Sequence, residues 1–184
     1  MKVLNVGGGA TRDLPKRYDG WGQILLDINP DVKPDICKDA KRLTELQEGV
    51  FDAVYCSHNL EHFYKHDVPL VLEGFLHVLN ENGFAEISVP DVVALMVDMM
   101  SRNHDIGDVW YRTGEGTAIT FHDVLYGWNA AMAQGNEYYA HKCGFTPISL
   151  AAALQAAGFK SIFISAHDKN ITAIAYKKEG ASCP

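Results

Sequence analysis

The chain opens with an apolar stretch, residues 3–6, that runs directly into three consecutive glycines at residues 7–9. Glycine has no Cβ, so a backbone leaving a strand here can turn sharply and approach a ligand closely. A second apolar run ends in Asp27, where a carboxylate can accept hydrogen bonds from the hydroxyls of a ribose. Together these features are typical of a doubly wound sheet that binds a nucleoside-bearing ligand. The glycines alone also fit a plain strand-to-helix turn.

Length and charge narrow the class of protein. A chain of 184 residues suits one α/β domain and is too short for two large ones. The net charge of −7, without a basic stripe, argues against nucleic acid as a partner. No apolar run approaches a membrane span and no signal peptide is evident, so we expect a cytoplasmic protein without a membrane partner. The cysteines are scattered without a CxxC pair, and we expect reduced thiols: Cys37, Cys56, Cys143 and Cys183.

Strand and helix patterns alternate along the chain. The predicted strands are residues 2–6, 24–27, 35–38, 51–56, 84–89, 161–165 and 171–177. Three helices are predicted. The first begins after Asp67 as its N-cap, and the second spans residues 92–100. The third begins after Thr146 as its N-cap and ends at Gly158. This order predicts a single Rossmann-like α/β domain over residues 1–184. Its sheet would be doubly wound, seven-stranded and mostly parallel, with an antiparallel C-terminal hairpin strand.

Two segments interrupt the alternation. Residues 11–22 contain Pro15 and Gly20, so any first helix must be very short. Residues 100–145 give no strand signal and are polar and aromatic, which is typical of a lid or a binding loop. Exposed aromatic residues there could also pack against a second copy in a homo-oligomer. The polar candidates for substrate contact in this region are His122, Tyr126, His141 and Lys142.

Six stretches of the sequence resemble the class I S-adenosylmethionine-dependent methyltransferases. They are VLNVGGGAT (3–11), LLDINP (25–30), DICKDA (35–40), FDAVYCSHNLEHF (51–63), VLEGFLHVLNENGFAEISVPD (71–91) and the closing helix and hairpin. The resemblance is nearest to the small methyltransferase-11-like branch that often accompanies sugar and polysaccharide biosynthesis. It implies S-adenosylmethionine as the cofactor.

The resemblance also implies a set of cofactor-binding residues at the ends of the first four strands. They are Asn5, Gly7, Gly8, Gly9, Asp27, Ile28, Asp39, Ala40, Ser57 and His58. The glycines would lie against the methionine part, and Asp27 would hold the ribose with Ile28 on the adenine. Asp39 would accept from the adenine amino group beside the Ala40 backbone. Carboxylates suit a diol and an amino group because both are donors.

The chain departs from the family pattern at two positions of the glycine loop. Asn5 stands where the family usually has an acid, and Thr11 where it often has a third glycine. An amide can still hydrogen-bond at the first position, so we expect weaker cofactor affinity and not its loss. The usual helices before the first strand are absent as well, so residues 100–145 would have to cover the cofactor.

Three other functions use the same residues. A nicotinamide-dependent oxidoreductase would share the glycines and Asp27, but its motif needs a glycine where Arg12 stands. The segment from His58 to His62 spells H-x-x-E-H, as in zinc hydrolases, and would need a third ligand such as Glu137. We expect Glu61 and His62 to form a local polar network without a metal. A non-catalytic cofactor-binding or interaction protein of the same fold is the main alternative.

The favoured function is methyl transfer to an oxygen or nitrogen of a small-molecule acceptor, such as a sugar or related metabolite. The reaction would be an in-line displacement, with much of the rate coming from holding acceptor and methyl group in near-attack geometry. A neutral hydroxyl acceptor would need a base, and histidine has a suitable pKa. The candidates are His58 and His141.

Overall fold

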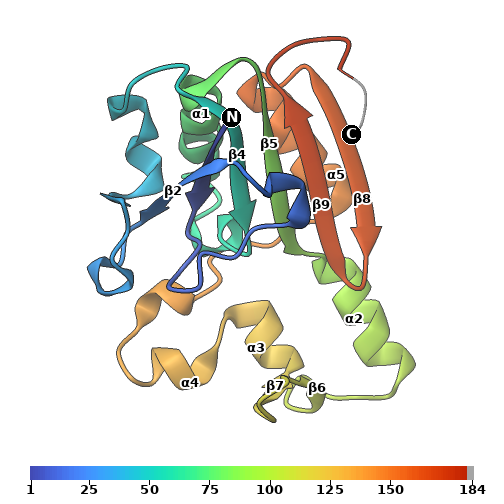
Figure 1. The fold of residues 1–184 in the computed structure, drawn as a ribbon. Helices are drawn as coiled ribbons and strands as arrows, with labels where there is room; N and C mark the ends of the chain where they lie inside the picture. The colour runs from blue at the N-terminus through green and yellow to red at the C-terminus, as the bar shows by residue number, and fades with distance from the viewer. Residues whose placement is uncertain (182–184) are drawn as a thin grey trace.

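The computed structural model describes residues 1–181, so Cys183 lies outside the described part of the chain. Seven strands form one sheet in the order β3-β2-β1-β4-β5-β9-β8 (Figure 1). The strands are β1 (Lys2–Val6), β2 (Gly22–Asp27), β3 (Ile36–Cys37), β4 (Phe51–Ser57), β5 (Leu79–Pro90), β8 (Ser161–His167) and β9 (Asn170–Tyr176). Strands β1 to β5 are parallel, whereas β9 is antiparallel to both β5 and β8. The predicted Rossmann-like sheet with its antiparallel hairpin is confirmed.

Strand β1 is an inner strand of the sheet and sets the position of the ligand site. It pairs with β2 on one side and with β4 on the other, so the chain changes direction across the sheet at β1. In open parallel sheets, ligands bind beyond the carboxyl ends of the strands at such a switch point. Gly7, Asp27 and His58 each follow or end one of these three strands.

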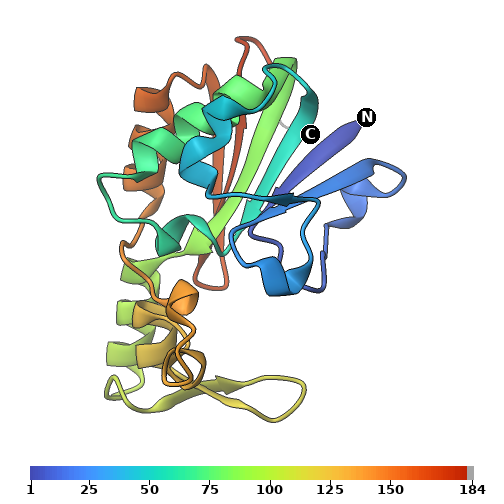
Figure 2. The ribbon, with the colours of Figure 1, turned by 90° about the vertical axis from the view of Figure 1, so that its left-hand side faces the viewer.

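One face of the sheet is covered by helices (Figure 2). They are α1 (Val68–Val78), α5 (Pro147–Ala157) and the short 3-10 helix η3 (Ala40–Glu45). The helix α5 begins with the predicted cap, because Thr146 and Ser149 form a capping box, and it ends at Gly158 with φ 111°. The predicted cap of α1 is only positional: the Asp67 side chain makes no capping hydrogen bond and instead accepts one from Lys41 Nζ at 3.4 Å.

The other face of the sheet is covered by fewer helical residues. Within residues 1–181, the only helical element on it is η1 (Lys16–Tyr18), three residues long, as Pro15 and Gly20 predicted. Tyr18 packs beside Trp21 and on Phe84 of β5, and it is 3% exposed. Its hydroxyl donates a 2.8 Å hydrogen bond to the buried carboxylate of Glu86. One aromatic side chain therefore takes over part of the covering that a longer helix would provide.

Strand β5 starts earlier than predicted. The predicted strand covered residues 84–89, whereas the observed strand already begins at Leu79. The register with β4 shifts between Phe51 and Ala53, so the extra residues are absorbed in an irregular pairing. Asn80 supports this start by donating a 2.9 Å hydrogen bond to Asp52.

The expectation that residues 100–145 contain no strand was wrong. The chain leaves the sheet through α2 (Val92–Ser101) and then forms a two-stranded hairpin of β6 (Val109–Arg112) and β7 (Ala118–Thr120). Helices α3 (Phe121–Tyr126) and α4 (Asn129–Met132) and the 3-10 helix η5 (Glu137–Tyr139) follow. The available signal was a turn containing Gly116, at φ 85°, between two short β-favouring runs.

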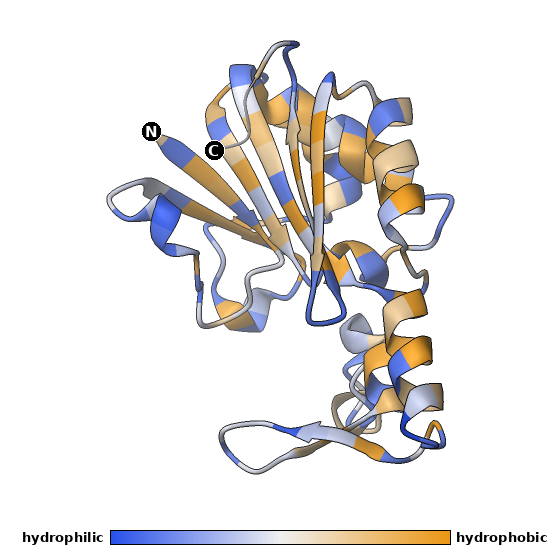
Figure 3. Cartoon of the chain, turned by 90° about the vertical axis from the view of Figure 1, so that its right-hand side faces the viewer, coloured by the Kyte–Doolittle hydropathy of each residue, from blue (hydrophilic) through white to orange (hydrophobic). Residues whose placement is uncertain are grey.

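These elements form a layer beyond the carboxyl ends of the strands (Figure 1). Figure 3 shows hydrophobic residues along the central strands and on α2, and polar residues at the turn between β8 and β9. Asp168 and Lys169 in that turn have φ of 48° and 61°, the left-handed values that a tight hairpin turn needs. In the described part of the chain, no helix has the length and hydrophobicity that a bilayer crossing requires.

We predict that Tyr18→Phe lowers the free energy of unfolding by about 1–3 kcal/mol, because it leaves the buried Glu86 carboxylate without its hydroxyl donor. Denaturant unfolding measures this. Tyr138→Phe is the control, since Tyr138 is 51% exposed and a surface change should stay within about 0.5 kcal/mol. A loss for Tyr18→Phe no larger than the control's would contradict the stabilising role of this hydrogen bond.

Candidate active site

The glycine loop after β1 has a backbone that other residues would strain. Gly7 and Gly9 have φ of 70° and 60°. A Cβ at Gly7 would collide with the side chain of Asn59, and one at Gly8 with the side chain of Asn5. A Cβ at Gly9 would meet nothing within 4 Å. The loop therefore needs glycine for a different reason at each position. At Gly9, the space that a Cβ would occupy is open to a ligand.

Asp27 ends β2 beside this loop. Its carboxylate accepts a 2.9 Å hydrogen bond from the Asn29 amide and a 3.3 Å one from the Gly9 amide. Each carboxylate oxygen can accept more than one hydrogen bond, so both retain capacity for ligand hydroxyls. Backbone amides thus hold Asp27 in place for the predicted ribose contact.

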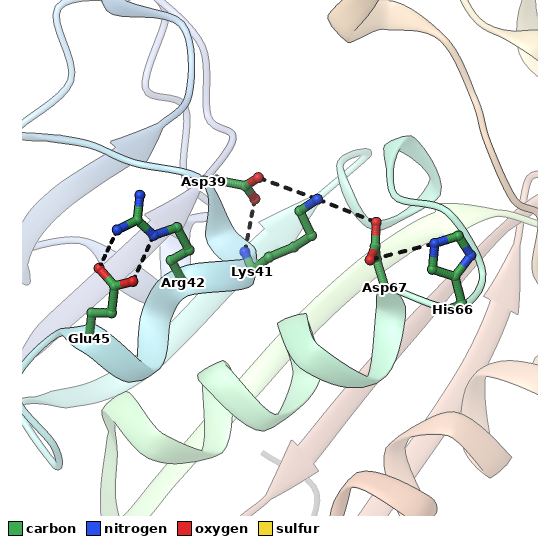
Figure 4. A network of polar contacts seen from close by, with 6 residues as sticks. All are labelled: Asp39, Lys41, Arg42, Glu45, His66 and Asp67. Carbon is green, nitrogen blue, oxygen red and sulfur yellow. Dashed lines mark hydrogen bonds and ion pairs between the residues drawn. The ribbon is translucent and has the colours of Figure 1, made fainter.

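Asp39 ends the turn after β3 and caps η3, accepting from the Lys41 amide at 2.9 Å. The Lys41 ammonium lies 3.6 Å from Asp39 and 3.4 Å from Asp67 (Figure 4). The Asp39 carboxylate is the main reason that the pKa of Lys41 is raised. Lys41 was not foreseen, although its place two residues after Asp39 was the available signal.

These residues line a cavity of about 290 Å³ at the carboxyl ends of β1, β2 and β4. Of the predicted cofactor-binding residues, those that line it are Gly7, Gly9, Asp27, Ile28, Asp39 and His58. The others are outside its lining: Asn5 is 1% exposed beneath Gly8, Ala40 is buried, and Gly8 and Ser57 are partly exposed.

The segment after α4 closes the cavity from the other side. Asn136, Tyr138, Tyr139 and Lys142 contribute to its lining. Lys142, predicted as a substrate contact, therefore belongs to the first cavity, where its ammonium lies 5.3 Å from the centre of the Tyr64 ring. Chain from the 100–145 region therefore forms part of the wall of this cavity.

A second cavity of about 700 Å³ adjoins the first, and His58, His62 and Tyr139 line both. Its walls combine aromatic and charged side chains. The aromatic ones include Trp110, Tyr111 and Trp128, and the charged ones include Arg102, Asp123 and Lys169. This volume is within the range of small-molecule sites.

His141 lines the second cavity and lies against His62, with 4.9 Å between the ring centres. Burial is the main cause that lowers the pKa of His141. The carbonyl of Glu61 accepts hydrogen bonds from the amides of Lys142 at 2.8 Å and Cys143 at 3.2 Å. These bonds bring the returning chain next to the loop after β4.

The Glu61 carboxylate lies at the same junction. One of its oxygens is 3.5 Å from His58 Nδ1, and the side chain is 2% exposed. Burial, and secondarily the Glu61 charge, raise the pKa of the neighbouring Cys143 thiol to about 11. The sequence suggested a pair of His58 and His62, whereas the ring packed against His62 is that of His141.

The structure places the two remaining substrate candidates away from both cavities. His122 and Tyr126 lie on α3 with their rings 5.0 Å apart, and Tyr126 is 54% exposed. Neither contributes to the lining of either cavity. Their predicted role in substrate binding stays a prediction that this geometry does not favour.

The fold is that of the S-adenosylmethionine-dependent methyltransferases. An enzyme of this kind from Archaeoglobus fulgidus superposes with a TM-score of 0.63 at 16% identity, over 96% of this chain and 86% of that one. One from Methanosarcina mazei gives 0.59 at 14% identity, over 96% and 92%. The Burkholderia thailandensis 1,6-didemethyltoxoflavin-N1-methyltransferase, with bound S-adenosylhomocysteine, gives 0.54 at 18%, over 97% and 71%.

The match to a family model covers a shorter part of the chain than the structural superpositions, and it points to the same class of protein. Residues 8–87 match the family model described as a methyltransferase domain, and this stretch includes Asp27, Asp39 and His58. A search of curated proteins found no match. Residues 8–87 thus resemble a methyltransferase domain, and the fold agrees with the predictions of an enzyme of this class and of S-adenosylmethionine as its cofactor.

We predict that Asp27→Asn weakens the binding of S-adenosylhomocysteine by about 10- to 100-fold, because a charge-assisted hydrogen bond contributes about 1.5–3 kcal/mol. Isothermal titration calorimetry measures the affinity. The matched control is Asp31→Asn, an exposed acid four residues away that lines neither cavity. Equal affinities for Asp27→Asn and the wild type would reject the ribose assignment.

We predict opposite main effects for alanine at two glycines of the loop. Both variants incur about 1–2 kcal/mol of left-handed backbone strain. Gly7→Ala must also displace Asn59, so it should lose more stability in urea unfolding. Gly9→Ala has room for its methyl group but places it at the cavity, so its main loss should be in cofactor affinity. Equal stability losses would refute the role of Asn59.

Proposed function

We propose that this protein transfers the methyl group of S-adenosylmethionine to an oxygen or nitrogen of a small, polar acceptor molecule. The observation that carries the proposal is the junction of two cavities at His58, His62 and Tyr139. One cavity has the residues expected to hold the cofactor, and the other is free for an acceptor. Methyl transfer requires two ligands in contact, and this arrangement provides adjoining places for them.

The residues of the first cavity fit the cofactor. Gly9 leaves open space for the methionine part, and Asp27 keeps acceptor capacity for the ribose hydroxyls. Asp39 offers its carboxylate, and Lys41 a donor, to the edge of an adenine ring. When bound, the cofactor supplies an electrophilic methyl group on a positively charged sulfur.

The second cavity suits an acceptor with both apolar faces and polar groups, such as a sugar or a related metabolite. Trp128 and Tyr111 offer ring faces, while Arg102, Asp123 and Asn170 offer donors and acceptors. A sugar ring presents apolar C–H faces for stacking and hydroxyls at its rim. Mixed walls of this kind place a ligand by a few polar contacts within a largely apolar surface.

His58 is the residue best placed to receive a proton from a hydroxyl acceptor. It lines both cavities, its side chain is 52% exposed, and Nδ1 faces Glu61 at 3.5 Å. Its backbone has φ 48°, an unusual value for a residue other than glycine, and such strain often occurs at functional sites.

Residues 136–142 act in this proposal as the cover over the cofactor. They contribute Asn136, Tyr138, Tyr139 and Lys142 to the first cavity, and Tyr139 to the second as well. A cover that contacts both ligands excludes water from the reacting atoms and holds the two ligands together. Orientation of this kind is a large part of the rate in bimolecular reactions.

The test is formation of S-adenosylhomocysteine by the full chain with S-adenosylmethionine and a panel of sugars, amines and phenols. We expect turnover with at least one polar acceptor. Trp128 lines only the second cavity and Tyr64 only the first. Trp128→Ala should therefore raise the acceptor KM by about threefold to tenfold without changing cofactor affinity. Tyr64→Ala should weaken cofactor affinity by a similar factor without changing the acceptor KM.

Cofactor binding without transfer to any member of the panel would overturn the proposal in favour of a non-catalytic binding protein. Loss of cofactor affinity in Trp128→Ala would contradict the division of the site into two cavities.

A further inference from the structure

Glu61 is a buried carboxylate without hydrogen-bond partners among the described residues. The residue is 1% exposed, and neither Oε1 nor Oε2 accepts a hydrogen bond. The nearest cationic candidate, His58 Nδ1, lies at 3.5 Å. Removing a carboxylate from water without partners is unfavourable, and such groups are usually paired or bind metals. The position of Glu61 therefore requires a positive partner.

Two histidines place ring nitrogens beside this carboxylate. One ligand atom from each of Glu61, His62 and His141 can be chosen so that all three lie within 4.8 Å of one another. Two ligands of one tetrahedral zinc ion are about 3.3 Å apart, because each lies about 2.0–2.2 Å from the metal. The side chains must therefore rotate to bring their ligand atoms closer before all three can contact one ion.

Hydrogen bonds to the backbone leave each imidazole with one free nitrogen. His62 Nδ1 lies 3.1 Å from the carbonyl oxygen of Ala140 and donates to it. The His141 ring hydrogen-bonds the backbone of Val124. In metal sites, a histidine typically donates one N–H to a carbonyl or carboxylate and binds the ion through its other nitrogen. Both rings have this arrangement.

The backbone already holds these residues together. The amides of Lys142 and Cys143 donate to the carbonyl of Glu61, which fixes the chain around His141 against the loop that contains His62. The site therefore does not depend on the ion to bring two distant parts of the sequence into contact. A backbone that already holds the ligands near one another lowers the ordering cost of binding an ion.

We infer that Glu61, His62 and His141 bind a divalent transition-metal ion, with an open coordination position at the second cavity. Two imidazoles and a carboxylate suit ions such as Zn²⁺ and leave room for a further ligand. His62 and His141 both line the second cavity, so that ligand would come from there. A role in orienting an acceptor oxygen rests on the proposed function, whereas binding of the ion does not. A ligand cannot also be the general base, which leaves His58 for that task.

The test is zinc binding by the full chain after removal of metals with a chelator. Inductively coupled plasma mass spectrometry after dialysis against Zn²⁺ gives the stoichiometry, and calorimetry gives the affinity. We expect one ion per chain. Glu61→Gln keeps the shape and the backbone carbonyl but removes the charge, so it should weaken binding by at least about tenfold, as should His141→Ala.

The matched control is His167→Ala. His167 is 89% exposed and lies 3.0 Å from Asp168, so it represents an adventitious surface pair. We expect this variant to bind zinc like the wild type. Absorption of bound Co²⁺ in the visible range gives a second readout that does not depend on turnover.

Two outcomes would overturn the inference: no retained zinc in the wild type, or binding that Glu61→Gln and His141→Ala leave unchanged. Neither measurement uses an acceptor or a methyl donor, so the result is separate from the fate of the proposed function. Circular dichroism of each variant excludes unfolding as the cause of a loss.

Discussion

Both cavities depend on the pair of hydrogen bonds that the Glu61 carbonyl accepts from the amides of Lys142 and Cys143. These bonds join the loop after β4 to a segment that returns from the outer layer of helices. Together with the hydrogen bond from His62 Nδ1 to the Ala140 carbonyl, they fix Tyr139 and His141 relative to His58 and His62. Hydrogen bonds of the backbone, and not a large apolar interface, thus define where the two ligands would meet.

The sheet supplies the other half of the site by geometry alone. Parallel strands end at one edge, so Gly7, Asp27 and Asp39 come together although the sequence separates them. Their positions are held by amide donors and not by long side chains, which keeps the carboxylates available. Helices α1 and α5 pack along one face of the sheet and not over the edge where these strands end (Figure 2).

The parts that were predictable from the sequence are those fixed by local patterns. The glycine loop, the place of Asp27 and the succession of strands along the chain follow from short motifs and from alternation, and the capping box at Thr146 follows from its neighbours. The contact of His62 with His141 was not predictable in this way, because it depends on how an irregular segment returns across the sheet. The hairpin of β6 and β7 was missed because each strand is only a few residues long.

The zinc-hydrolase pattern shows the same limit. In the sequence, His58 and His62 lie four apart and suggest a helix with two ligands on one face. The structure has only a three-residue 3-10 helix there, η4 (Leu60–His62), so the spacing has no helical meaning. Glu61 is instead buried near His141, which is distant in the sequence. The residues that can act together are therefore set by the tertiary structure.

The three side chains shared by the cavities have a thermodynamic consequence. His58, His62 and Tyr139 contact whatever occupies either cavity, so a first ligand that orders them reduces the entropy that the second must lose. Linkage then requires that each ligand raise the affinity of the other by the same factor. The two occupants would bind cooperatively through a wall in common, with no movement of the sheet.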